Sequence, residues 1–75
     1  MANWLLSGFS SDEAYGEREP DWEGDMVGSI DDAMLRAREW LRDQPTDACV
    51  ELIADEGSTA RVLRVVTHTG VEDIG

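Results

Sequence analysis

The sequence predicts a single α+β domain, residues 1–75, in which one helix packs on an antiparallel sheet of three or four strands. A helical pattern with start and stop signals covers residues 29–43, and two apolar runs joined by a tight turn within residues 48–67 predict a β-hairpin. The length of 75 residues allows one small core and little room for a deep catalytic cavity. The expected order is β-(β)-α-β-β.

The segment Asn3–Phe9 is short, apolar and aromatic and ends in Ser10-Ser11-Asp12, which indicates a first strand followed by a turn. The next eighteen or so residues would form an unusually long loop for a compact domain, so a second strand is expected within residues 14–26. Pro20 lacks a backbone N–H, which places this strand at a sheet edge or divides it.

The helix begins after Ser29, a favourable N-cap residue, with Asp32 at the capping-box position and Gln44-Pro45 as the stop signal. Its buried side is predicted to hold Ile30, Ala33, Met34, Ala37, Trp40 and Leu41, and its exposed side Asp31, Arg36, Arg38, Glu39, Arg42 and Asp43. The spacing allows an ion pair between Asp32 and Arg36; the alternative is that the helix arginines form a second, mixed-charge contact surface.

The hairpin consists of a strand over 48–54, a turn over Asp55–Ser58 and a return strand over 59–67. Apolar side chains on both sides of the return strand predict that it is central in the sheet. The tail, Thr69–Gly75, is expected to fray. Trp4, Met34 and Trp40 are expected in the core.

The charge balance is the strongest global feature. There are 17 acidic residues against six basic ones, all Arg, for a formal net charge of −11. Such a chain repels phosphate backbones and anionic membranes, so the expected partner is a basic protein surface, with no direct contact to nucleic acid or membrane. A leader peptide or membrane span is not evident, and a cytoplasmic location is expected.

Side chains that could support catalysis are few. The single cysteine, Cys49, excludes an intramolecular disulfide or a thiolate zinc cluster and is expected to be a small buried hydrophobe. The only histidine, His68, has Ser10, Ser58 or Cys49 as candidate nucleophiles, and no nucleophile-elbow motif surrounds any of them. The chain is therefore predicted not to be an enzyme, and no cofactor is expected.

The distinctive segment is residues 17–25, in which acids occupy every odd position. In an extended chain successive side chains alternate in direction, so the five carboxylates would lie on one face, about 6.6 Å apart, with Pro20 and Trp22 on the other. The predicted partner-binding residues are Glu17, Glu19, Asp21, Trp22, Glu23, Asp25, Asp31 and Asp32. Trp22, with Tyr15 as a second candidate, either packs into the core or serves as an aromatic anchor for the partner.

A calcium-binding loop is a further possible interpretation of this segment. Starting at Glu19 places Gly24 at position 6 but Ile30 at position 12, whereas starting at Asp21 places Asp32 at position 12 but Met26 at position 6. Both registers are incomplete, so at most weak calcium binding is expected and no metal ligand is assigned.

In its size, its acidity, its single helix on a hairpin sheet and its Glu17–Asp25 acids, the chain resembles the small acidic inhibitors of phages and mobile elements, including anti-CRISPR and anti-restriction proteins. Some of these mimic the charge of DNA. The resemblance implies a cytoplasmic inhibitor, in the host cell if phage-encoded, that occupies the nucleic-acid site of a nucleic-acid-binding protein. Arg36, Arg38 and Arg42 depart from a pure DNA mimic.

A different class of function stays open. The acidity is equally typical of a small housekeeping domain in a salt-adapted or high-GC prokaryote, where it keeps the surface hydrated. Such a domain could be a monomer or could dimerise through a strand edge.

Overall fold

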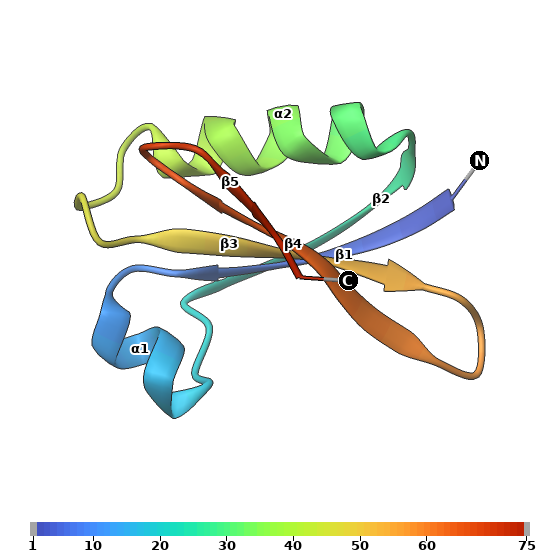
Figure 1. The fold of residues 1–75 in the computed structure, drawn as a ribbon, viewed down its shortest axis with the longest axis horizontal. Coiled ribbons are helices and arrows are strands. Elements are labelled where there is room, and N and C mark those ends of the chain that lie inside the picture. The colour runs from blue at the N-terminus through green and yellow to red at the C-terminus, as the bar shows by residue number, and fades with distance from the viewer. Residues whose placement is uncertain (1, 75) are drawn as a thin grey trace.

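The computed structural model describes residues 2–74 and confirms the α+β class (Figure 1). The elements in chain order are β1 (Ala2–Phe9), α1 (Asp12–Glu17), β2 (Trp22–Gly28), α2 (Ile30–Leu41), β3 (Cys49–Asp55), β4 (Ala60–Thr67) and β5 (Val71–Asp73). The five strands form one sheet, which has more strands than the three or four expected. A second, short helix, α1, was not expected.

The strands lie in the order β2-β1-β3-β4-β5, and every neighbouring pair is antiparallel. The two helices cover opposite faces of the sheet (Figure 1). We call these the α2 face and the α1 face. β2 and β5 are the edge strands, so the segment before the long helix supplies an edge strand, as Pro20 indicated.

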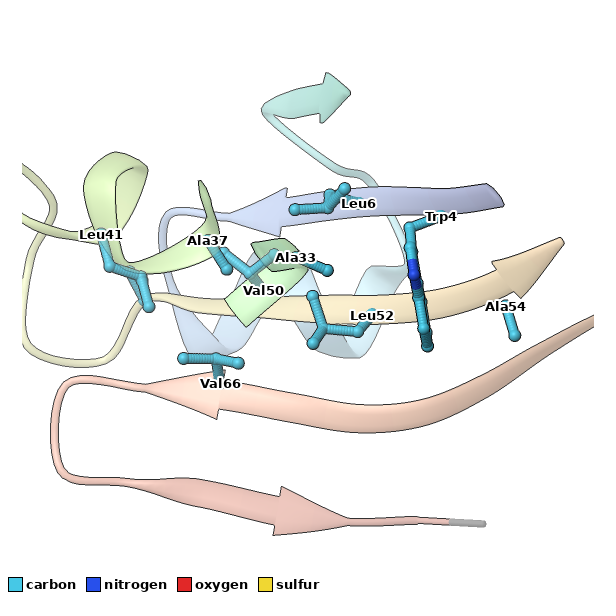
Figure 2. Packing of buried hydrophobic residues seen from close by; sticks show 10 residues of the cluster. Trp4, Leu6, Ala33, Ala37, Leu41, Val50, Leu52, Ala54 and Val66 are labelled. Carbon is cyan, nitrogen blue, oxygen red and sulfur yellow. The ribbon is translucent and has the colours of Figure 1, made fainter. Parts of the chain in front are cut away.

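The main core lies between α2 and the sheet (Figure 2). Alternate residues of β1 and β3 point toward the helix, including Leu6, Val50 and Leu52, all at most 1% exposed. Ala33 and Ala37 are fully buried, and their small side chains bring the helix close to the strands. Trp4 is buried and donates from Nε1 to the carbonyl of Gly28 at 3.1 Å, which ties β1 to the end of β2.

The long helix has the predicted start. Ser29 Oγ accepts a hydrogen bond from the amide of Asp32 at 3.2 Å, and the Asp32 carboxylate accepts one from the amide of Ser29 at 3.2 Å. This capping box satisfies two amide groups that the helix cannot pair internally. The helix ends at Leu41, two residues before the predicted end, with Arg42 as its C-cap.

Two tryptophans pack at the β2 edge under α2. Trp22 of β2 and Trp40 of α2 stack with ring centroids 5.4 Å apart and an interplanar angle of 13°. A Cβ atom on Gly8 would lie 2.9 Å from the Trp40 ring and 3.0 Å from the Trp22 ring. The absence of a side chain at Gly8 therefore allows the two stacked rings to lie directly against β1.

The prediction that the return strand is apolar on both sides and lies inside the sheet is confirmed for β4, and a bulge sets which face two of its residues take. Leu52 pairs with Arg64 and Ile53 pairs with Val62, so Leu63 is an extra residue in β4. This bulge reverses the alternation of side chains at that point, so that Val62 joins Val65 in the cluster on the α1 face and Leu63 joins Val66 in the cluster on the α2 face. β4 lies inside the sheet because the expected fraying tail contains β5; Gly75 of that tail lies outside the described residues.

Candidate acidic interface on strand β2

Strand β2 carries two of the predicted carboxylates on the α1 face. Residues of β2 alternate between half-buried and exposed, and the exposed ones are Glu23, Asp25 and Val27. Asp25 is opposite Leu5 of β1, and Glu23 is opposite Ser7. α1 covers Phe9 and Cys49 at the other end of this face, so these carboxylates border the part of the face that α1 leaves open.

The five acids of residues 17–25 do not form one row, which corrects the extended-strand prediction. Glu17 ends α1, and Glu19 and Asp21 lie in the connection before β2 begins at Trp22. The chain turns at Arg18, which adopts a left-handed conformation with φ 58° and caps α1. Only Glu23 and Asp25 therefore share the regular spacing of about 6.6 Å along a strand.

Asp21 has a local structural role. Its Oδ2 accepts a hydrogen bond from the amide of Ser10 at 2.8 Å, which links the start of α1 to the start of β2. This bond lowers the pKa of the Asp21 carboxyl, because it favours the charged form. A substitution at Asp21 would therefore alter this connection as well as the surface charge.

The two aromatic candidates face inward. Trp22 lies on the α2 face, opposite to Glu23 and Asp25, where its ring stacks on Trp40 and has the Arg36 guanidinium 4.9 Å from its centroid. Tyr15 packs edge-on against Phe9 with centroids 5.1 Å apart. Trp22, half-buried in the α2 layer, and the β2 carboxylates thus belong to different faces of the molecule.

The acids at the start of α2 lie beyond the end of β2. Both Asp31 and Asp32 are exposed, but the Asp32 carboxylate is engaged in the capping box. The expected pair between Asp32 and Arg36 is replaced by one between Arg36 and Glu39, with an N–O distance of 3.8 Å. Asp31 remains an exposed carboxylate in the first turn of the helix.

An ion pair under α1 was not foreseen from the sequence. The Arg18 guanidinium donates two hydrogen bonds to the Glu51 carboxylate, each 2.8 Å long. Glu51 is only 3% exposed, and Arg18 also lies over the Phe9 and Tyr15 rings at 5.6 and 5.5 Å. The one basic residue of the acidic segment is therefore committed to neutralising a buried carboxylate.

Two titratable side chains beside this pair, Cys49 and Tyr15, have their pKa raised by burial. Burial raises the pKa of the Cys49 thiol to about 11, with Glu51 adding to the shift, so the thiol is protonated at neutral pH. Burial and the nearby Glu51 also raise the pKa of Tyr15. His68 is exposed, beside Arg38 and Arg42 at the end of α2.

Four of the 17 acids pair with an arginine among residues 2–74: Glu39, Glu51, Glu56 and Asp73. The seven predicted acidic site residues are all among the remaining thirteen. Asp21 and Asp32 accept backbone hydrogen bonds, which leaves Glu17, Glu19, Glu23, Asp25 and Asp31 as exposed carboxylates without an ion pair or a side-chain hydrogen bond in the described part of the chain. We call Glu23 and Asp25 of β2, together with Glu19 of the connection that leads into it, the β2 acidic surface.

Both calcium registers run through β2, where the carboxylates lie along a strand instead of around a loop. Within residues 2–74 there is no group of three or more His, Cys, Asp or Glu side chains arranged to hold a metal ion. In the same range, no helix has the length and apolar character needed to cross a membrane.

Comparisons with protein-family models, with curated proteins and with solved structures gave no match to this chain.

Proposed function

We propose that this protein is a non-enzymatic inhibitor that binds a basic surface of a nucleic-acid-binding protein through the β2 acidic surface. The observation that carries the proposal is the state of Glu19, Glu23 and Asp25. All three are exposed and lack a cationic partner among residues 2–74, and Glu23 and Asp25 border the open part of the α1 face. Their charge is available to a partner's Arg and Lys side chains.

The mechanism is competitive occupancy of the nucleic-acid site. Carboxylates take the Arg and Lys contacts that otherwise hold phosphates, and the net charge of −11 speeds association with a basic surface. Asp31 extends the negative surface beyond the end of β2. The proposed location is the cytoplasm, where nucleic-acid-binding enzymes act.

A charge-matched capture experiment tests this proposal. The wild-type chain is immobilised, a bacterial lysate is passed over it, and bound proteins are eluted with duplex DNA. The surface variant carries Glu19→Lys, Glu23→Lys and Asp25→Lys. The control carries Glu13→Lys, Asp43→Lys and Glu72→Lys, three exposed acids outside this surface and without an ion pair in residues 2–74.

Wild type and control are expected to retain a protein that DNA releases, and the surface variant is expected to lose it. Because both variants have the same formal net charge, equal capture by all three chains would contradict a specific role for the β2 acidic surface. Equal loss from both variants would instead indicate that total acidity, as in a salt-adapted domain, governs the binding.

A further inference from the structure

The backbone of β2 has one free side. The amide of Asp21 donates to the carbonyl of Gly8 at 2.8 Å, so Gly8 directs its carbonyl toward β2. Hydrogen-bonding direction alternates along an antiparallel strand, which makes Trp22, Gly24 and Met26 the residues of β2 that bond to β1. The N–H and C=O groups of the intervening residues, Glu23, Asp25 and Val27, therefore point away from the sheet.

The same three residues direct their side chains to the α1 face, where Leu5 is 37% exposed and Val27 is 58% exposed. A strand added at this edge would hydrogen-bond directly to Glu23, Asp25 and Val27. Its side chains opposite them would emerge on the α1 face beside two carboxylates and an apolar patch. The backbone edge and the acidic surface are thus parts of a single binding surface.

A second copy of this chain is a poor occupant of the edge. The antiparallel register that pairs all of β2 with itself is centred on Asp25 and places two Asp25 carboxylates opposite one another. The register centred on Gly24 places Glu23 of one copy opposite Asp25 of the other. The register centred on Met26 pairs only residues 24–28 of the two copies. Like charges directly opposite one another destabilise a strand pair, and each chain carries a net charge of −11.

We infer that β2 accepts an extended basic segment of the partner as a sixth strand of the sheet. This inference rests on the proposed function and specifies how the partner is held. Backbone hydrogen bonds to Glu23, Asp25 and Val27 supply affinity, and the side chains supply selectivity. In the antiparallel orientation, the partner segment reads apolar–x–basic–x–basic, with the apolar residue opposite Val27 and the basic residues opposite Asp25 and Glu23.

Matched peptides separate strand addition from simple charge attraction. The probe is the capped peptide Thr-Val-Thr-Lys-Thr-Lys-Thr. In the first derivative, both Lys residues are N-methylated, because their amides would point to β2. In the second, the two Thr residues between Val and the second Lys are N-methylated, because their amides would point away from β2. All three peptides carry the same charge, and binding is measured by isothermal titration at low salt.

The unmodified and Thr-methylated peptides are expected to bind, with the Lys-methylated peptide weaker by about tenfold or more, because two backbone hydrogen bonds are lost. Equal binding of all three would overturn strand addition but leave charge-based binding intact. Failure of all three peptides to bind would also overturn strand addition. The proposed inhibition is tested separately, by the DNA-elution experiment.

The protein side is tested with Val27→Pro, which removes one outward N–H without changing charge, and Val27→Thr, which keeps it. Proline is tolerated at edge positions whose N–H faces solvent. Val27→Pro is expected to weaken binding of the unmodified peptide by about threefold or more, as for one hydrogen bond, with Val27→Thr close to wild type. Slower amide exchange at Glu23 and Asp25 with bound peptide would support the register, and unchanged exchange there would contradict it.

Discussion

Individual residues in this chain have uses that their type alone does not reveal. Arg18 is the only base among the first 32 residues, and the sequence gives no sign that it reaches Glu51, 33 positions away. The pairing depends on α1 and on the left-handed backbone at Arg18. By contrast, the capping role of Ser29 and Asp32 was predictable, because both ends of that contact lie within four residues.

Loss of Arg18 should destabilise the fold. In Arg18→Met the Glu51 carboxylate keeps its buried position but loses both hydrogen bonds, so the free energy of unfolding should fall by about 1–3 kcal/mol. The side chain of Arg18 is 58% exposed, so water can partly replace the hydrogen bonds that Arg18 donates to Glu51. Urea denaturation followed by circular dichroism measures the change.

Adding Glu51→Gln to Arg18→Met should recover part of that loss, because a neutral amide is less costly to bury than an unpaired carboxylate. A double variant no more stable than Arg18→Met would show that Arg18 acts through its ring contacts, and not by neutralising Glu51.

Gly8 provides a second test at the residue scale. In Gly8→Ala the new methyl group would lie 2.9 Å from the Trp40 ring, so the stacked tryptophans must shift, at a cost of about 1–3 kcal/mol. Near-ultraviolet circular dichroism should report the altered Trp22–Trp40 stack. The control is Gly16→Ala, whose methyl group meets nothing within 4 Å; equal losses in the two variants would contradict the packing explanation.

At the scale of elements, the strands and the helix with strong local patterns were predictable from the sequence, whereas the short elements α1 and β5 were not. The first strand, the long helix and the hairpin are confirmed because each shows periodicity together with start or turn residues. α1 has only six residues, and its start at Ser11-Asp12 is equally typical of a turn. β5 has three residues that acquire strand geometry only by pairing with β4. The prediction of one extended row of carboxylates over residues 17–25 was wrong for the same reason, because α1 and Arg18 redirect the chain before β2 begins.

The capping box should be a measurable part of the stability of α2. Ser29→Ala removes the hydroxyl that accepts from the Asp32 amide, so the free energy of unfolding should decrease by about 1 kcal/mol. Asp31→Asn removes a charge in the same turn without breaking the box and should cost only a few tenths of a kcal/mol. Similar values for the two variants in chemical denaturation would argue against the cap.

At the scale of the whole molecule, the net charge opposes folding, and in the proposed function it favours binding to a basic partner. Thirteen acids lack an ion pair within residues 2–74, so they repel one another in the compact state. Composition made this general property predictable. The sequence could not show which carboxylates remain available, because that depends on contacts such as the amide of Ser10 with Asp21.

Salt should therefore have opposite effects on folding and on association. Raising the ionic strength screens the self-repulsion, so the melting temperature should increase, while binding of the basic peptide should weaken. Thermal melts and titrations at two salt concentrations measure both. A melting temperature that falls with salt would contradict the repulsion account, and unfolding at low salt would favour the salt-adapted domain.

The most direct test of the central claim is displacement of labelled duplex DNA from a captured partner, followed by fluorescence anisotropy. Wild type and the control variant with Glu13→Lys, Asp43→Lys and Glu72→Lys should release the DNA. The surface variant with Glu19→Lys, Glu23→Lys and Asp25→Lys should leave it bound, because it lacks the carboxylates that replace phosphates. If the surface variant released DNA as effectively as the control, the β2 acidic surface would not be the site of inhibition.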